Sequence, residues 1–389
     1  MLTEHFHNTQ KDTGHYSNDL RYVLSLQNTI AAFEEIKTWE GYAKTPLHSL
    51  DSLASDIGVK NIYYKDESSR FGLGSFKALG GTYGVLKFIH HALKKEIGDE
   101  VSMKDIHAGK YSEQISKYTV TTATDGNHGR SVAFGAKLFG CKCQIYIHSE
   151  VSSGRQKAME DLEATVNRIS GNYDASLQIC IEDAGKNNWH VISDTSYEGY
   201  TKYPRYIMAG YNVMAEEIID QIKDRPLPTH VFLQGGVGSF PGAICGYFWE
   251  KFPGNNIKFV VVESEHAPCL IRSAQNNQMT SVNIKQETMM AGLSCGEPSL
   301  LGWEILRSGA DDFITINDSS IPGLMRLLAK NNLKIEAGES SVAGLAGLIE
   351  SMEDQKIAKA MGLNKESIVL LFGTEGATDP EIYRSIISE

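Results

Sequence analysis

The 389-residue sequence has no extended tract of lysine and arginine and no apolar run of bilayer length. Its formal net charge is -11, and acidic and basic residues are interspersed along the chain. A nucleic-acid-binding protein would show a basic patch, and a membrane protein would show a continuous hydrophobic segment. We therefore expect neither a nucleic-acid partner nor membrane association. Residues 1–20 are polar where a signal peptide needs an apolar core, so the expected location is cytoplasmic.

Cysteine is also scarce, because the six cysteines in this length are too few for a disulfide framework. Cys141 and Cys143 have neither a second cysteine pair nor flanking histidines at zinc-site spacing, so no metal site is predicted. Cys269 and Cys295 fall in loop-like or helix-start settings. A disulfide between these two, ordering a loop near the site, is a hypothesis that the sequence leaves open.

Repeats and low-complexity segments are absent as well, and 41% of the residues are apolar, which is enough to bury the cores of two domains. From residue 61 onward, short β-branched runs alternate with segments of helical periodicity. This alternation indicates an α/β fold with more than one parallel sheet covered by helices. The predicted strands are 61–65, 118–123, 144–148, 190–193, 230–234, 258–263, 313–317 and 367–372, and helical patterns include 155–164, 206–222 and 243–251.

One lysine follows a glycine-rich turn and begins an apolar helical pattern. Gly72 and Gly74 permit backbone conformations closed to other residues, and Ser75 is predicted to cap the helix that contains Lys77. Partial burial favours the neutral amine of a lysine, which is the form that makes a Schiff base with an aldehyde cofactor. The alternative is a surface lysine whose side chain extends from a helix N-terminus into solvent.

A second motif lies at 121–130, where a strand leads into a helix. It contains Asp125, Gly126, Asn127 and His128 in succession. The unpaired N–H groups of a helix N-terminus can hold a carboxylate, and the histidine can transfer protons. Asp125 can equally be an ordinary N-cap, and His128 can simply orient the loop.

A third motif at 234–242 again connects a strand to an apolar helix. Successive glycine N–H groups beside a hydroxyl form a cradle suited to a phosphate. The residues that would form it are Gly235, Gly236, Gly238 and Ser239.

Dinucleotide binding is the alternative for this third motif. Glu263 ends the next predicted strand, about where the ribose-binding acid of a Rossmann unit would lie. Counted from Gly236, however, the third glycine position of the dinucleotide motif is occupied by Pro241. A nicotinamide-dependent dehydrogenase would also leave the segment around Lys77 unexplained.

Together, the three motifs in this order resemble the fold type II family of pyridoxal-phosphate enzymes. Within that family the segments are similar to those of the diaminopropionate ammonia-lyases, and the resemblance extends from about residue 42 to residue 384. Gly74 departs from the family pattern, where a larger residue such as asparagine often stands, and this affects only local loop contacts. The segments that carry the resemblance are KDES at 65–68, RFGL at 70–73, TDGNHGR at 124–130, DTSYEGYT at 194–201, AGLSCGEP at 291–298 and TEGATD at 374–379.

The resemblance implies a role for each motif in binding pyridoxal 5'-phosphate. Lys77 would hold the cofactor as a Schiff base, and Asn127 would hydrogen-bond its phenolic oxygen. The glycine loop, with Gly235, Gly236, Gly238 and Ser239, would hold its phosphate. Thr374 would face the pyridine nitrogen, and a neutral hydroxyl there would leave that nitrogen largely unprotonated.

The resemblance also implies an α,β-elimination of D- or L-2,3-diaminopropionate to pyruvate and ammonia. Lys77 would remove the α-proton of the L isomer, and Asp125 would do so for the D isomer from the opposite face. Asp125 and Asp194 would bind the second ammonium of this small amino-acid substrate or move protons near it. Gly126 and His128 would also contact substrate. A serine or threonine dehydratase of the same fold is the alternative, and an NAD-dependent dehydrogenase is a more distant one.

The implied architecture has two open, twisted, mostly parallel sheets covered by helices. A discontinuous large cofactor-binding domain would comprise residues 1–88 and 223–389, and a small α/β domain would comprise residues 89–222. The active site would lie in the cleft between the two domains. Enzymes of this fold are usually homodimers, which we expect here by analogy.

Overall fold

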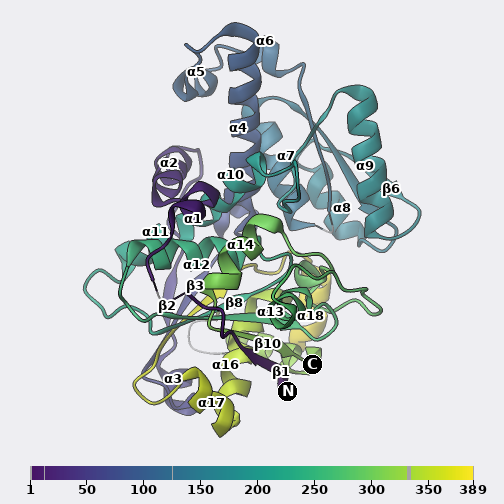
Figure 1. The fold of residues 1–389 in the computed structure, drawn as a ribbon. Helices are drawn as coiled ribbons and strands as arrows, with labels where there is room; N and C mark the ends of the chain where they lie inside the picture. The colour runs from purple at the N-terminus through teal and green to yellow at the C-terminus, as the bar shows by residue number, and fades with distance from the viewer. Residues whose placement is uncertain (1, 13, 125, 331–333, 389) are drawn as a thin grey trace. The chain divides into compact units, whose positions relative to one another are not determined.

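The computed structural model describes residues 2–12, 14–124, 126–330 and 334–388. The chain divides into two compact units (Figure 1). The first unit consists of Met1–Phe76, Thr195–Gly199 and Tyr211–Glu389, and the second consists of Lys77–Asp194 and Tyr200–Gly210.

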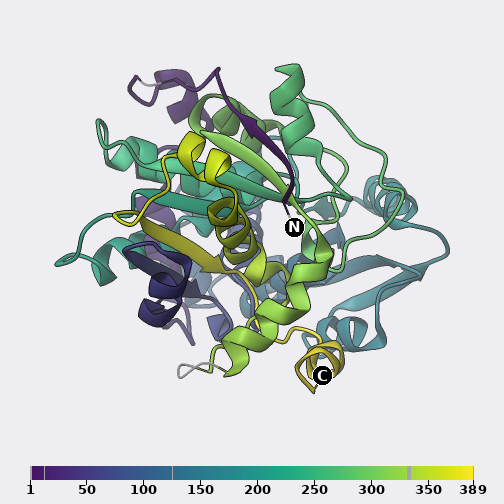
Figure 2. The same cartoon turned by 90° about the horizontal axis from the view of Figure 1, so that it is seen from below.

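The first unit contains a seven-stranded sheet in the order β1-β10-β9-β8-β11-β3-β2. The five central strands are parallel to one another, whereas β1 pairs antiparallel with β10 and β2 pairs antiparallel with β3. Figure 2 shows the purple strand β1 alongside the light-green β10 at one edge. The strands are β1 (Leu2–His7), β2 (Leu47–Ser49), β3 (Asn61–Asp66), β8 (His230–Gln234), β9 (Lys258–Ser264), β10 (Asp312–Ile316) and β11 (Ile368–Gly373).

Central strands of this sheet have apolar middles and are almost entirely buried. Every residue of β8, β10 and β11 is buried, because helices cover both faces of a parallel sheet. The α-helices of this unit are α1 (Asn18–Val23), α2 (Leu26–Ile36), α3 (Asp51–Ile57), α11 (Val213–Gln221), α12 (Ser239–Lys251), α13 (Cys269–Asn276), α14 (Leu300–Gly309), α15 (Ile321–Lys330), α16 (Ala343–Glu353), α17 (Gln355–Met361) and α18 (Pro380–Ser388). Short 3-10 helices are η1 (Arg70–Gly72), η2 (Ala291–Leu293), η3 (Asp318–Ser320) and η4 (Glu339–Val342).

The second unit contains a four-stranded parallel sheet in the order β6-β5-β4-β7. Its strands are β4 (Thr119–Ala123), β5 (Lys142–His148), β6 (Thr165–Ile169) and β7 (His190–Val191). Its helices are α4 (Lys77–Ile97), α5 (Met103–His107), α6 (Ser112–Ile115), α7 (Asn127–Phe139), α8 (Ser153–Glu160), α9 (Tyr173–Asn187) and α10 (Lys202–Tyr211).

Helices α4 and α7 approach each other closely because glycine lies at their contact. A Cβ atom on Gly81 of α4 would overlap Ser131 of α7, and a Cβ atom on Gly135 of α7 would lie 3.0 Å from the Thr82 Cα. The missing side chains therefore let the two backbones pack against each other. This contact joins the helix that begins at Lys77 to the helix that begins at Asn127.

The predicted fold class is confirmed, since the structure has two mostly parallel sheets surrounded by helices. All eight predicted strands are present, with small differences at their ends. The prediction omitted β1, β2 and β6. These are edge strands of polar or mixed composition, and β2 has only three residues, so they lack the apolar run by which a buried strand is recognised.

Other boundaries differ from the prediction for local reasons. The helix expected over 206–222 is broken at Asn212, whose buried amide donates to the Thr29 hydroxyl at 3.0 Å. The strand expected over 190–193 ends at Val191. The chain passes between units at 76/77, 194/195, 199/200 and 210/211, whereas the predicted boundaries were 88/89 and 222/223. Helical periodicity is the same along all of α4, so the sequence pattern of this helix does not indicate where one unit ends and the other begins.

Four charged side chains form a fully buried network in the first unit. The Arg70 guanidinium binds both carboxylate oxygens of Glu67, at 2.7 and 2.9 Å, and both of Glu217, at 2.8 Å each. The Lys65 amine binds Glu217 at 2.6 Å and the Thr45 carbonyl at 2.8 Å. Two cations are thus balanced by two carboxylates, and the network holds the turn that follows β3 against α11.

Burial by itself raises the pKa of the Glu217 carboxyl, but Arg70 and Lys65 outweigh this effect and lower it to about 2 from an ordinary value of 4.5. A carboxyl whose folded-state pKa is lowered stabilises the protein above its unfolded-state pKa. This stabilisation is lost as the pH falls from 4.5 toward about 2. The network therefore predicts a steep loss of stability in acid.

We predict that Glu217→Gln lowers the free energy of unfolding at neutral pH by about 3–5 kcal/mol, because it leaves buried cations without their counter-charge. Urea titrations should also show a shallower dependence of stability on pH between 4.5 and about 2. Glu113→Gln is the control, since Glu113 and Lys117 form an exposed ion pair and little change is expected. Equal losses in the two variants would contradict the assignment of the network as a stabilising element.

Among the described residues, no helix combines the length and apolar character required to cross a membrane.

Candidate functional site

Lys77 is the first residue of α4, and its amine forms an ion pair with the Asp194 carboxylate. Both side chains are mostly buried, with exposed fractions of 22% for Lys77 and 14% for Asp194. The turn before the helix has positive φ at Gly72 (69°) and Gly74 (71°), as predicted. Ser75 lies two residues before the helix and forms a β-bridge with Glu375, so it does not occupy the predicted capping position.

His128 lies beside this ion pair on α7. Its Nε2 is 2.8 Å from the Ile192 carbonyl oxygen, and its Nδ1 is 3.9 Å from the Asp194 carboxylate. Burial lowers the pKa of His128, and the positive charge of Lys77 acts in the same direction, against the opposing effect of Asp194. A neutral imidazole whose Nε2 donates to a backbone carbonyl orients the segment before Asp194.

The segment that leads to Asp194 is braced by Tyr200. The Tyr200 hydroxyl donates to the Val191 carbonyl at 2.9 Å and accepts the Ser193 N–H at 3.0 Å. This side chain takes over the hydrogen bonds of the backbone where β7 ends. It therefore explains why the strand is shorter than predicted.

On the other side of Asp194, two buried hydroxyls hold the chain to α14. Ser299 is the N-cap residue of α14, but its side chain makes no capping bond there and instead accepts the Ser196 N–H at 3.0 Å. The Ser196 hydroxyl accepts the Leu301 N–H at 2.8 Å and contacts the Ser299 hydroxyl at 2.7 Å. Ser196 thus caps α14 from a distant segment. The Ser299 N–H donates to the carbonyl of Val237, within the glycine loop, at 2.6 Å.

The second motif opens α7 as predicted, with Gly126 at the N-cap and Asn127 as the first helical residue. The Thr124 hydroxyl accepts the N–H groups of Gly126 at 3.0 Å and Gly129 at 3.1 Å. Thr124 therefore caps the helix. Asp125 lies outside the described residues.

The glycine loop between β8 and α12 has the crowded geometry of an anion cradle. Gly238 is the N-cap of α12 with φ of 98°, and no side chain caps the helix there. A Cβ atom on Gly235 would lie 2.8 Å from Leu270, and one on Gly236 would lie 3.0 Å from the Gly292 carbonyl. The loop thus requires glycine, and the N–H groups at the start of a thirteen-residue helix are of the kind that can bind an anion.

Thr374 follows β11 and lies beside the end of β8. Its hydroxyl is 3.1 Å from the side-chain nitrogen of Gln234, and its carbonyl accepts the Phe76 N–H at 3.1 Å. Thr374 is 3% exposed. Phe76 is the residue immediately before Lys77, so this backbone hydrogen bond holds the chain directly next to that lysine.

Glu263 has a structural role that excludes the proposed ribose contact. Its two carboxylate oxygens accept the N–H groups of Leu270 and Ile271, both at 2.7 Å, and the side chain has no exposed surface. Burial raises the pKa of Glu263 to about 8, although these two N–H groups oppose the shift. The Glu263 carboxyl group therefore caps α13 and is not accessible to a ligand. The dinucleotide interpretation of the third motif required this residue to bind a ribose, so it is not supported.

Comparison with known proteins identifies the family. The model of pyridoxal-phosphate dependent enzymes matches residues 38–373. The diaminopropionate ammonia-lyase of Escherichia coli K12 is 38% identical over 90% of this chain and 88% of its own. The diaminopropionate ammonia-lyase of Salmonella typhimurium LT2 is 37% identical over 94% of each chain. The chain belongs to the diaminopropionate ammonia-lyase family of pyridoxal-phosphate-dependent enzymes.

A solved structure of this family supports the same conclusion. The Escherichia coli diaminopropionate ammonia lyase in complex with an aminoacrylate-PLP azomethine reaction intermediate superposes with a TM-score of 0.88. Its sequence identity is 35%, and the match covers 100% of this chain and 97% of that chain.

The residues of this chain fit the family's cofactor. The glycine loop provides an uncapped helix N-terminus for a phosphate, and Lys77 provides an amine next to a carboxylate. Thr374 provides a buried hydroxyl at the end of a central strand. These three features are the complements of a phosphate, an aldehyde and a ring nitrogen.

Sequence reasoning assigned no role to Ser196, Ser299 and Gln234, which make hydrogen bonds to predicted site residues or to the backbone next to them. Each acts through a hydrogen bond to a residue distant in sequence or to backbone at a strand end. The available signals were that Ser196 lies two residues after Asp194 in a motif that resembles the family and that Gln234 begins the third motif.

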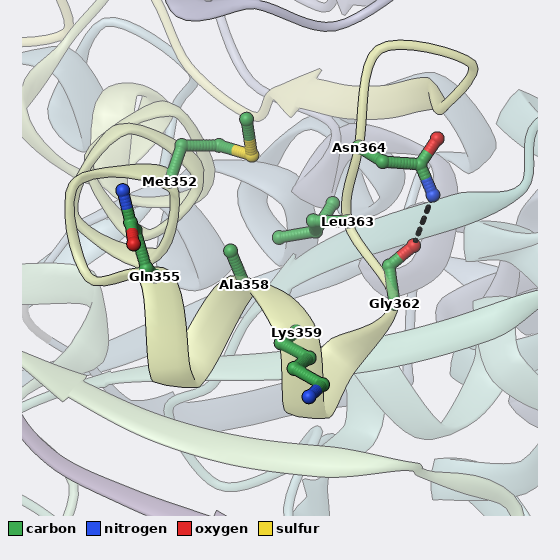
Figure 3. Close-up of a pocket in the computed structure, with 7 residues that line it drawn as sticks. All are labelled: Met352, Gln355, Ala358, Lys359, Gly362, Leu363 and Asn364. Carbon is green, nitrogen blue, oxygen red and sulfur yellow. Dashed lines mark hydrogen bonds between the residues drawn. The ribbon is translucent and has the colours of Figure 1, made fainter.

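Two further features are a pair of cysteines beside the glycine loop and a cavity elsewhere on the first unit. Cys269 and Cys295 are present as thiols, and the Cys269 sulfur is 3.6 Å from the Gly236 carbonyl oxygen. A cavity of about 470 Å³ on the first unit contains none of the predicted site residues (Figure 3). It is lined by Met352, Gln355, Ala358, Lys359, Gly362, Leu363 and Asn364.

No group of three or more histidine, cysteine, aspartate or glutamate side chains is arranged to hold a metal ion in the part of the chain that the structure describes.

We predict that Ser196→Ala lowers kcat for the family's reaction several-fold, because it releases the backbone beside Asp194. It should also lower the free energy of unfolding by about 1 kcal/mol through loss of the helix cap. The matched control is Ser102→Ala, which removes the N-cap side chain of α5, where Ser102 accepts the Asp105 N–H at 3.1 Å. Steady-state kinetics that show the same kcat for both variants would refute a positioning role for Ser196.

Proposed function

We propose that this protein is a pyridoxal-phosphate-dependent lyase that converts 2,3-diaminopropionate and water to pyruvate and two molecules of ammonia. The observation that most directly supports this proposal is the ion pair between the Asp194 carboxylate and the Lys77 amine, with His128 beside it. A substrate with a second ammonium group matches a carboxylate at this position. The relatives that bear the name of this activity cover nearly the whole chain, which supports the same substrate.

The cofactor would be held by residues of all three motifs. Lys77 would bond its aldehyde carbon, the loop from Gly235 to Ser239 would bind its phosphate, and Asn127 and Thr374 would contact its ring oxygen and ring nitrogen. When bound, the cofactor supplies a conjugated ring that stabilises negative charge at the substrate α-carbon. Each remaining task falls to side chains of the protein.

Proton transfer is divided among Lys77, Asp125 and Asp194 in this proposal. The Lys77 amine removes the α-proton of the L isomer, and Asp125 removes it from the D isomer on the opposite face. Asp194 binds the β-ammonium of the substrate or returns a proton to it, which makes ammonia the leaving group. Its mostly buried position strengthens this charge interaction. Gly126 and His128 line the substrate at the start of α7.

A serine or threonine dehydratase of the same fold is the second candidate. Its substrates carry a neutral hydroxyl where diaminopropionate carries an ammonium, so they offer the Asp194 carboxylate no positive charge to bind. The structure thus favours the diamino acid. As further parts of the proposal, the protein acts in the cytoplasm and forms a homodimer, both by analogy with the fold.

We predict that purified protein reconstituted with pyridoxal phosphate shows the visible absorption band of a lysine-bound cofactor and that this band shifts as diaminopropionate is converted to pyruvate. Lys77→Ala should lose this band and at least a thousand-fold in kcat, because the amine is the group that bonds the cofactor and abstracts a proton. Serine and threonine, tested at equal concentration, should react much more slowly. Faster pyruvate formation from serine would assign the protein to the dehydratases, and a protein that gains no band would overturn the proposal.

A separate prediction concerns the two isomers. Asp125→Asn should lose activity on the D isomer far more than on the L isomer, because only the D isomer relies on this base. Asp194→Asn should slow both isomers to a similar extent, since both present the same β-ammonium. The measurement is kcat/KM for each isomer with each variant. Equal losses in Asp125→Asn would mean that the residue serves binding or loop geometry.

A further inference from the structure

The side-chain amide of Gln234 makes a set of contacts that the proposed function does not explain. Gln234 is the last residue of β8 and is 2% exposed. Its nitrogen lies 2.8 Å from the Phe372 carbonyl oxygen, 3.1 Å from the Ser340 carbonyl oxygen and 3.1 Å from the Thr374 hydroxyl. Its oxygen is buried and has no hydrogen-bond partner among the described residues.

The orientation of this amide is determined by its neighbours. Backbone carbonyl oxygens only accept hydrogen bonds, so the side of the amide that faces Phe372 and Ser340 must be the NH2 group. The opposite orientation would place three oxygen atoms against one another and lose both bonds. The protein keeps this orientation even though it leaves the amide oxygen unpaired, which costs about 1–3 kcal/mol in a buried setting.

This orientation decides the direction of the Thr374 hydroxyl proton. An amide nitrogen carries two N–H groups and does not accept, so the Thr374 hydroxyl cannot donate to Gln234 and can only share an N–H group that also faces a backbone carbonyl. No other partner of this hydroxyl is found within the described residues. Its proton therefore points elsewhere and is available to an acceptor placed beside Thr374.

We propose that Gln234 is a positioning residue that makes Thr374 a hydrogen-bond donor and thereby keeps the ring nitrogen of the bound cofactor unprotonated. This inference rests on the proposed function, because Thr374 is the residue proposed to contact that nitrogen. A ring nitrogen can accept the Thr374 proton only when it carries no proton itself. An unprotonated ring withdraws electrons less strongly, so charge at the substrate is passed on promptly to the leaving group, as β-elimination requires.

The test is the nitrogen-15 NMR shift of pyridoxal phosphate labelled at the ring nitrogen and bound to the holoenzyme. Spectra of the labelled cofactor free in solution, at pH values below and above the pKa of its ring nitrogen, give the reference chemical shifts of the protonated and unprotonated forms. The wild-type signal should lie at the unprotonated reference. Gln234→Glu should move it toward the protonated reference, because a carboxyl oxygen can accept the Thr374 proton and free the hydroxyl to accept from the ring.

The matched control is Gln221→Glu. Gln221 also donates to a backbone carbonyl, that of Thr45 at 2.9 Å, but it lies in the buried charge network and should leave the nitrogen signal unmoved. A wild-type signal at the protonated reference overturns the inference even if Gln234→Glu fails to fold. A folded Gln234→Glu whose signal stays at the wild-type position also overturns it. If the protein takes up no cofactor, the proposed function fails instead, whereas pyruvate formation with a protonated ring nitrogen leaves that function intact and removes only the role of Gln234.

Discussion

The bidentate contacts of Arg70 with Glu67 and Glu217 are the constraint on which the local geometry of the first unit depends. They connect the end of β3 to α11 with no exposed surface on any of the charged side chains. A buried ion pair adds little net stability compared with apolar packing, but its removal on one side is costly. The main effect of this network is to fix the position of the turn at Arg70, which leads within seven residues to Lys77.

The site residues separate into two sets, each organised by its own unit. In the second unit, Lys77, His128 and Asp194 form a charge-linked group whose geometry follows from the close packing of α4 and α7. In the first unit, the glycine loop and Thr374 lie at the ends of the neighbouring strands β8 and β11. Polar side chains whose partners are backbone carbonyls, such as His128 and Gln234, support both sets.

Much of the fold was predictable because central parallel strands contain continuous apolar runs, as β11 and the middle of β8 show. The edge strand β6 was missed because its pattern is polar. For the site, local motifs predicted the positive φ of Gly72 and the helix start at Asn127. They did not predict the contacts of Ser196 with α14, since hydrogen bonds between residues a hundred positions apart leave no spacing pattern in a single sequence.

The position of β11 in the first unit has a consequence for how the protein is made. This strand lies between β8 and β3 in the interior of the sheet, yet residues 368–373 are synthesised after all the other strands of that sheet. The second unit is encoded entirely before β8 and can fold while the ribosome is still at work, whereas the first unit must wait with two strand edges unpaired. A premature stop codon shortly before residue 368 therefore removes an interior strand of the large sheet, and the remaining chain is a substrate for chaperones and proteases.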